Sequence, residues 1–258
     1  MTVFPSTLRA ATCAAAVLLA AGCAHPPLPA PINTSRLGLT KPAGTVPKGV
    51  VQLETGYSRA RLDQRTRHGF GETLVRVGLG PRTEVRGGIS TYLSTVTPAA
   101  TVQGVGDASL SVKHRLLTNA GWVPALGVTV GSSIPTGAQS VSAGEPQPEG
   151  AVAAEWRLPR GLRAMTMAAH RSAFAADDRF GQTTLAAAGR SNIGKDAVAH
   201  LEYAHVLSTR AGAPDVGHLR GGAALRLNPN LQLDGWVGRA TSGGKHELVL
   251  GVGFAQRW

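Results

Sequence analysis

Cysteine is almost absent from this sequence of 258 residues, which contains only Cys13 and Cys23. Cys13 lies in an apolar stretch, residues 10–21, that follows Arg9 and is too short to cross a membrane as a helix. A positive residue before such a stretch is typical of a signal peptide, whose removal would take Cys13 away. The mature chain would keep one cysteine, which excludes a disulfide, a CxxC motif and a cysteine-based zinc site.

The end of this stretch resembles a bacterial lipoprotein signal, in which the cysteine becomes the first mature residue and is acylated. It reads Leu-Ala-Ala-Gly-Cys over Leu19–Cys23, although its second position holds alanine where that signal prefers a larger aliphatic residue. We therefore expect a signal peptide at residues 1–22 and lipidation of Cys23. An ordinary signal peptide, cleaved near Gly22 or Ala24, is the alternative.

Long apolar runs are missing after Cys23. Residues 23–48 are rich in proline, and we expect them to form an extended or disordered tether that buries no core. No later stretch approaches the roughly 20 apolar residues of a membrane helix. If the chain spans a membrane it must do so as a closed barrel, because only a barrel then satisfies every backbone group in lipid.

Charged and aromatic residues are also scarce, at 16% and 5% of the chain, whereas glycine is abundant with 33 residues. This composition favours many short strands over helices. The formal charge of +11 suits an anionic membrane surface, an anionic solute or scattered solvated side chains. Because the sequence contains no compact run of Lys and Arg, we expect no nucleic acid partner.

From Gly49 onward the polarity alternates with a period of two residues, as in strands with one apolar face. In the first segment Val51 and Leu53 share one face and Gln52 and Glu54 share the other. Twelve segments follow this pattern, the seventh and eighth less clearly, at residues 51–58, 72–79, 84–90, 107–116, 122–131, 152–158, 162–170, 180–189, 197–203, 218–227, 231–237 and 247–254. We predict an all-β fold, an antiparallel up-and-down transmembrane β-barrel of about 12 strands over residues 49–258.

The connections between these segments alternate in length. Tight turns are expected at 80–82, 118–121, 159–160 and 228–230, and longer polar loops at 59–69, 94–103, 132–149, 171–178, 208–217 and 239–246. Outer-membrane barrels have short periplasmic turns and longer external loops. The start of the first strand and the end of the last strand should therefore both lie on the periplasmic side, together with Cys23. Trp258 keeps the parity of the last apolar face and resembles the terminal aromatic residue that serves as an assembly signal in outer-membrane proteins.

A soluble β-sandwich or a lipocalin-like barrel, tethered through Cys23, is the alternative to a membrane barrel. Its apolar face would point inward, and alternation alone does not distinguish the two. The loop lengths and Trp258 favour the membrane barrel. Against it, the chain has few aromatic residues to form the two aromatic girdles of such a barrel. Five aromatic residues lie near predicted strand ends and are candidates for girdle or core: Tyr57, Trp122, Trp156, Tyr203 and Trp236.

Three short stretches resemble a known family. They are Gly78–Val85, which reads GLGPRTEV, then Gly104–Asp107 continuing to Ser111–Arg115, and then Ile134–Gly137. Their order and spacing are similar to those of the putative meta-pathway of phenol degradation proteins. The resemblance implies an outer-membrane barrel loosely associated with the uptake of aromatic compounds. That family's pattern contains no catalytic residues, so none is carried over.

The polar face of the predicted strands would line the barrel interior. Ten residues are expected there: Arg76, Arg86, Asp107, Lys113, Arg115, Arg157, His200, Glu202, Arg220 and Arg226. Asp107 shares a face with Lys113 and Arg115, which indicates a lumenal ladder of charges or structural ion pairs. Because cations outnumber acids, we expect a mild preference for anions if the lumen is open. The loop at 132–149 is a candidate plug.

Two motifs indicate ligand binding only weakly. Residues 189–195 read G-x-x-x-x-G-K, but Asp196 stands where a phosphate-binding loop needs Ser or Thr. His200 and Glu202 share a strand face, yet two ligands do not make a metal site. We therefore predict no metal and no cofactor.

Three functional hypotheses follow. The first is a passive outer-membrane channel or uptake protein for small solutes, with aromatic and anionic compounds as candidates. The second is a lipid-anchored structural or binding barrel without transport. The third is a lipid-modifying enzyme in which His170 acts as base for Ser172 with Glu155 or Glu202 orienting it, and we expect the chain not to be an enzyme. The expected partners are outer-membrane lipids, the barrel-assembly machinery and a small solute, at the bacterial outer membrane.

Overall fold

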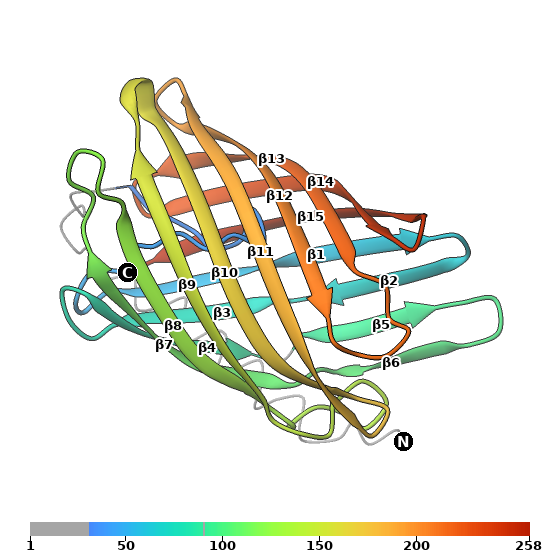
Figure 1. Ribbon diagram of the computed structural model, residues 1–258. Helices are drawn as coiled ribbons and strands as arrows, with labels where there is room; N and C mark the ends of the chain where they lie inside the picture. The colour runs from blue at the N-terminus through green and yellow to red at the C-terminus, as the bar shows by residue number, and fades with distance from the viewer. Residues whose placement is uncertain (1–30, 90) are drawn as a thin grey trace, which may run out of the picture.

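The computed structural model describes residues 31–89 and 91–258 (Figure 1). The predicted signal peptide and Cys23 lie outside the described residues. Within those residues, no helix is long and apolar enough to cross a membrane.

Nearly all of the described chain is strand, which confirms the predicted all-β fold. The strands are β1 Val51–Leu62, β2 Arg65–Phe70, β3 Thr73–Gly78, β4 Thr83–Ile89, β5 Tyr92–Val96, β6 Thr101–Val105, β7 Ala108–Leu117, β8 Ala125–Ile134, β9 Gln147–Arg157, β10 Leu162–Ala175, β11 Asp178–Ile193, β12 Ala197–Ser208, β13 Val216–Asn228, β14 Leu231–Ser242 and β15 Lys245–Arg257. One short 3-10 turn, η1 Pro159–Gly161, joins β9 to β10.

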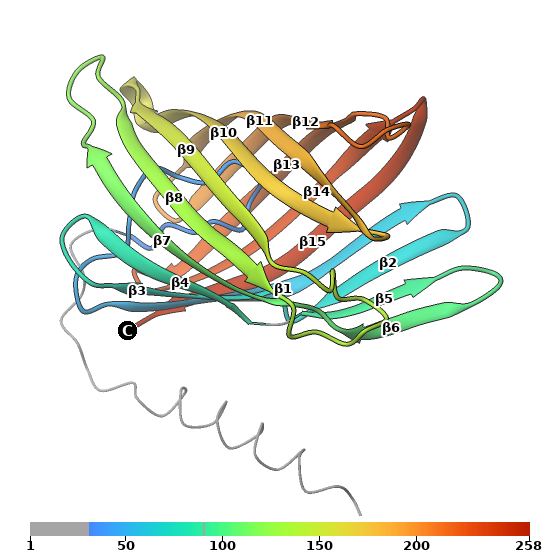
Figure 2. The ribbon, with the colours of Figure 1, turned by 60° about the horizontal axis from the view of Figure 1, so that its bottom comes forward.

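These strands form one closed antiparallel barrel, because β15 pairs with β1 as well as with β14. Three strands of the wall are each interrupted once: β2 continues into β3, β4 into β5, and β6 into β7. The two parts of each interrupted strand pair with the two parts of the neighbouring strand, or with β1. The wall therefore has 12 strands, as the sequence predicts. Figure 2 shows the strands tilted and closed into one barrel.

The two ends of the barrel differ. One end, here called the turn end, carries the connections at 79–82, 118–124, 158–161, 194–196 and 229–230, and both Val51 and Trp258 lie there. The other, the hairpin end, carries those at 63–64, 97–100, 135–146, 176–177, 209–215 and 243–244.

The prediction of long loops at 59–69, 171–178 and 239–246 is wrong. Each is a pair of strands that continue to a two-residue turn, namely 63–64, 176–177 and 243–244. The β1–β2 and β5–β6 hairpins project beyond the rest of the wall in Figure 2. Strand residues that project in this way have water on both faces, so the alternation of polarity that identifies a strand disappears from the sequence.

The apolar face points outward, which excludes the soluble alternative with an apolar interior. Leu201 and Val130 are 62% and 63% exposed, whereas Glu54 and Glu84 on the inner face are 0% exposed. An exposed apolar belt around a closed barrel suits contact with lipid hydrocarbon.

Aromatic residues lie on this outer face toward both ends. Tyr57, Phe70 and Tyr92 pack together in the hairpin half of the barrel. Trp122 is 88% exposed at the turn end, and its carbonyl oxygen accepts a hydrogen bond from Trp156 Nε1. Trp236 differs from them, because it faces the lumen and lines a cavity there.

Candidate channel and its N-terminal plug

Residues 31–48, here called the plug, fill the middle of the lumen. Ile32, Leu37 and Thr40 are at most 4% exposed. The predicted disordered tether is therefore wrong over this range, and the predicted plug at 132–149 is wrong too. Residues 138–142 of that loop instead contact the β6–β7 region at the hairpin end.

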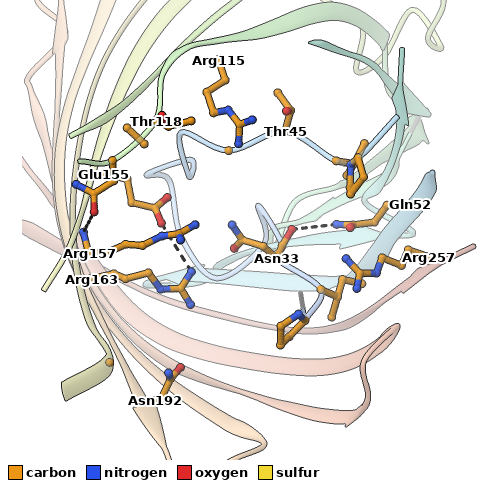
Figure 3. A pocket seen from close by; sticks show the side chains of 18 of the residues that line it. Asn33, Thr45, Gln52, Arg115, Thr118, Glu155, Arg157, Arg163, Asn192 and Arg257 are labelled. Carbon is orange, nitrogen blue, oxygen red and sulfur yellow. Dashed lines mark hydrogen bonds and ion pairs between the residues drawn. The ribbon is translucent and has the colours of Figure 1, made fainter. Parts of the chain in front are cut away.

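The plug enters and leaves the barrel at the turn end. Ile32 N donates to Pro229 O at 3.0 Å, and Gly49 N donates to Gly78 O at 2.8 Å. Between these points Arg36 reaches to Glu72 O and Val252 O, at 3.2 Å each. The segment thus forms a loop that extends into the lumen and returns, and Figure 3 shows it crossing the interior as a pale blue coil.

Carboxylates of the barrel wall hold the plug through its backbone N–H groups. Glu202 accepts from Leu39 N at 2.8 Å and Thr40 N at 2.5 Å. Three further wall residues, Glu54, Glu84 and Glu155, accept from Ser35 N, Val46 N and Ala43 N at 2.9, 2.6 and 3.3 Å. Charged acceptors form stronger hydrogen bonds than neutral ones, so a segment without regular secondary structure can be buried with its donors satisfied.

Arg76 on β3 compensates the charge of two of these carboxylates. Its guanidinium forms a two-pronged pair with Glu84 at 3.0 and 2.9 Å and a single hydrogen bond with Glu54 at 3.0 Å. The same group donates to Asn33 O of the plug at 3.0 Å. Since Arg76 is 2% exposed, the wall and the plug share one buried ionic network.

Glycines on the inner face of the wall make room for the plug. A Cβ atom on Gly127 would lie 2.5 Å from Ala43 O, and one on Gly253 would lie 2.5 Å from the Arg36 guanidinium. A Cβ atom on Gly78 would lie closer still to Pro47 O. At these positions the absence of a side chain is required by close approach of the plug.

The plug divides the lumen into cavities. About 780 Å³ is open at the turn end, about 960 Å³ at the hairpin end, and about 490 Å³ beside the plug. The last two adjoin through Leu39 and Lys41, whereas neither shares a lining residue with the turn-end cavity. Pro42 and Ala43 lie at this division, where Lys113 donates to Pro42 O and Ala43 packs against Gly127.

The turn-end cavity is strongly positive (Figure 3). Its titratable lining residues are Arg76, Arg115, Arg157, Arg163, Arg226 and Arg257, with Glu155 as the one carboxylate. Backbone carbonyls position two of the arginines: Arg115 donates to Pro81 O and Arg226 to Lys195 O, at 3.0 and 2.7 Å. Such an excess of fixed positive charge at a mouth raises the local concentration of anions.

The cavity beside the plug is amphipathic. Leu39, Leu74 and Met167 form its apolar part. Its basic residues are Lys41, Arg86, Lys113 and Arg171, and Glu149 is its one carboxylate. Burial, followed by the neighbouring charge of Arg86, lowers the pKa of Lys41 to about 8. A small solute with an apolar body and an anionic group matches this lining.

The hairpin-end cavity also contains an aromatic group. Trp236 lies under the guanidinium of Arg220, 4.5 Å from its ring centroid, and a Cβ on Gly251 would lie 2.5 Å from the indole. Cation–π stacking fixes both side chains. Both side chains line this cavity.

All ten residues expected in the lumen occupy inward positions of the wall or line a cavity. Arg76, Arg86, Lys113, His200 and Glu202 are buried against the plug, while Arg115, Arg157 and Arg226 line the turn-end cavity and Asp107 and Arg220 the hairpin-end cavity. The predicted ladder of Asp107 with Lys113 and Arg115 is wrong. Asp107 instead accepts from Gly137 N, Ser142 Oγ and Ala143 N, because the β6–β7 interruption turns it toward that loop.

Arg163, Arg190 and Arg257 are lumenal arginines that were not predicted from the sequence. Arg190 is 2% exposed and donates to Asn33 Oδ1 and His200 Nδ1 at 3.2 and 3.4 Å. Its strand is rich in Ala and Thr, which hides the alternation. The strand register reveals that Arg190 faces the lumen, because it pairs directly with His200 on β12.

His170 and Ser172 do not form a catalytic pair. His170 Nδ1 bonds Thr183 Oγ1 at 2.9 Å, and Ser172 Oγ accepts from Arg179 at 3.1 Å, on the outer face of β10. The acids suggested to orient the histidine, Glu155 and Glu202, face the lumen. Among the described residues, no group of three His, Cys, Asp or Glu could hold a metal.

Comparison with known proteins identifies both a family and a fold. The model of the family described as "Putative MetA-pathway of phenol degradation" matches residues 34–258, which begins within the plug. A search of curated protein sequences finds no match. An outer membrane channel from Pseudomonas putida F1 has a similar structure, with a TM-score of 0.67 and 14% identity over 88% of this chain and 100% of that one.

Two porins are also similar in fold. The KdgM porin, solved in complex with disordered oligogalacturonate, has a TM-score of 0.55 and 10% identity over 80% of this chain and 98% of its own. The NanC porin has a TM-score of 0.55 and 8% identity over 79% and 98%. At these identities the likeness concerns the fold.

Proposed function

Since the chain belongs to the family described as "Putative MetA-pathway of phenol degradation", we propose that it is an outer-membrane channel through which small solutes diffuse. The hairpin end would face the exterior and the turn end the periplasm. A closed barrel with an apolar outer face and a polar lumen supports this proposal. So does its resemblance to an outer membrane channel and two porins.

The observation that carries the proposal is the division of the lumen. Large cavities open at both ends, and the buried middle of the plug, including Thr40 and Ala43, separates them. The plug is held by hydrogen bonds and ion pairs rather than by an apolar core. Polar cavities on both sides of a polar plug suit a narrow channel whose width depends on the plug.

The solute class that fits is a small organic anion, including aromatic ones. Besides Arg76, which is paired with Glu54 and Glu84, the turn-end cavity has five arginines and one carboxylate, and this excess of positive charge favours anions. The cavity beside the plug adds an apolar lining to its cations. The name of the family agrees with an aromatic solute.

Diffusion through such a lumen needs no catalytic group, cofactor or metal, so we regard the chain as a transporter and not an enzyme. A lipoprotein signal at residues 1–22, acylation of Cys23 and recognition of Trp258 by the assembly machinery remain part of the proposal. The plug entering at the turn end would keep Cys23 on the periplasmic side. The second candidate, a closed structural or binding barrel, is favoured by the buried barrier at Ala43, which is 1% exposed.

Uptake into liposomes tests the proposal. Purified protein is reconstituted, and entry of labelled benzenesulfonate is compared with that of benzyltrimethylammonium, since both carry permanent charges and cross bare lipid slowly. We expect benzenesulfonate to enter at least about threefold faster because of the arginines. Entry of neither compound above protein-free liposomes would favour the closed barrel. Equal entry would refute the anion preference alone.

A further inference from the structure

Three arginines gather on the outer face of the barrel at its hairpin end. Arg61 on β1 pairs with Leu248 on β15, and Leu248 in turn pairs with Arg239 on β14. These strands lie side by side in Figure 1. Strands are spaced by about 4.8 Å, so the Cα atoms of Arg61 and Arg239 lie about 10 Å apart. Arg59, two residues from Arg61 on β1, has the same parity, and it also borders the hairpin-end cavity.

No carboxylate compensates these charges. Within the described residues, none of the three guanidiniums forms an ion pair, and Arg59 Nε is buried without a hydrogen-bond partner. The nearest acid on β15, Glu247, is paired with Arg67 at 3.0 Å. Asp63, in the β1–β2 turn, forms no ion pair with them either.

The cluster lies at the hairpin-end edge of the apolar belt, because Arg61 and Arg239 both pair with Leu248 and Arg59 pairs with Leu250. Leu248, Val237 and Val252, on the same faces of β14 and β15, are 53%, 54% and 55% exposed. Tyr57 on β1, which pairs with Val252, packs against Phe70 on β2 in this half of the barrel. In a membrane barrel this is the level at which hydrocarbon gives way to headgroups.

From this arrangement we infer that Arg59, Arg61 and Arg239 form a binding site for the phosphate of an outer-leaflet lipid headgroup. Guanidiniums bind phosphate with two parallel N–H···O bonds. The acyl chains of the same lipid would lie along the apolar belt below. Three uncompensated cations at a lipid boundary attract a multiply charged anion more strongly than they attract chloride.

Of the proposed function, this inference requires only that the barrel lies in the outer membrane; it does not require that the barrel conducts solutes. A barrel that binds phosphorylated lipid but passes no solute would leave it intact. A channel that shows no such binding would overturn it while leaving the proposed function standing.

Binding of diphosphoryl lipid A, measured by native mass spectrometry of the full mature chain in detergent, tests the inference. The variant Arg59→Gln/Arg61→Gln/Arg239→Gln should bind this lipid about tenfold or more weakly than the unchanged protein. Dephosphorylated lipid A should bind both proteins equally weakly. Inorganic phosphate at the same concentration should not displace the lipid, which distinguishes a lipid site from an ion site.

The matched control removes three other charges, as Arg82→Gln/Arg160→Gln/Arg179→Gln. Arg82 and Arg160 lie in turn-end connections, and Arg179 is paired with Glu145 at 3.5 Å. This control should bind diphosphoryl lipid A as the unchanged protein does. Equal losses in both triple variants, or binding that ignores the lipid phosphates, would overturn the inference. A heat-dependent gel shift verifies that each variant is folded.

Discussion

Replacing Arg76 by Met should lower the stability of the barrel by about 3–5 kcal/mol, because it leaves two buried carboxylates without their main cation. Glu54 and Glu84 are both 0% exposed, and Arg76 contacts both at 3.0 Å or less. The midpoint of urea unfolding, followed by tryptophan fluorescence in lipid vesicles, measures the change. The plug should also loosen, since Asn33, Ser35 and Val46 are held by these three residues.

The control for this prediction is Arg82→Met, which removes an exposed arginine from a turn. It should shift the midpoint little, as most surface substitutions do. Combining Arg76→Met with Glu84→Gln should restore part of the lost stability, because one uncompensated charge disappears. If Arg76→Met unfolds at the same urea concentration as Arg82→Met, the buried network does not stabilise the barrel.

Reversing the charge of the turn-end cavity should reverse the ion preference of the channel. We expect the unchanged protein to pass chloride more readily than potassium. Replacing Arg115, Arg157 and Arg226 by Gln should bring the permeability ratio toward one, and replacing them by Glu should bring it below one. The overall change should be at least about threefold. Reversal potentials in a KCl gradient across a planar bilayer measure it.

The Gln and Glu variants serve as controls for each other, because both change the charge at the same three positions. A second control is Arg61→Glu/Arg239→Glu, on the outer face, which should leave the ratio unchanged. A ratio that stays constant through the Gln and Glu variants would show that these arginines do not face the conducting path.

The barrel itself was predictable because membrane strands alternate strictly. Val130, Leu201 and Val252 follow that rule and lie on the outer face. The weakly patterned strands β10 and β11 were located only approximately. Their inner face carries Met165, Met167 and Ala186, which are buried, so both faces of these strands are apolar and the alternation is lost.

The plug could not be predicted from its own residues. Its proline content and lack of periodicity are typical of a disordered tether, and its burial depends on acids that are distant in the sequence. Leu39 N and Thr40 N bond to Glu202, 163 and 162 residues away. Alternation places Glu202 in the lumen but does not reveal which backbone it binds. Likewise, the inward glycines at 127 and 253 resemble ordinary strand glycines until the plug is seen against them.

The most direct test of the central claim, that the plug restricts an otherwise open lumen, is the single-channel conductance of the mature protein with and without residues 31–47. We predict small openings for the full chain and a conductance roughly an order of magnitude larger after the deletion, as expected for an empty 12-stranded barrel. Gly127→Val, which displaces Ala43, should show intermediate openings, whereas Gly150→Val, where a Cβ meets nothing within 4 Å, should not. Equal conductance with and without the plug, or no current from either protein, would contradict the account.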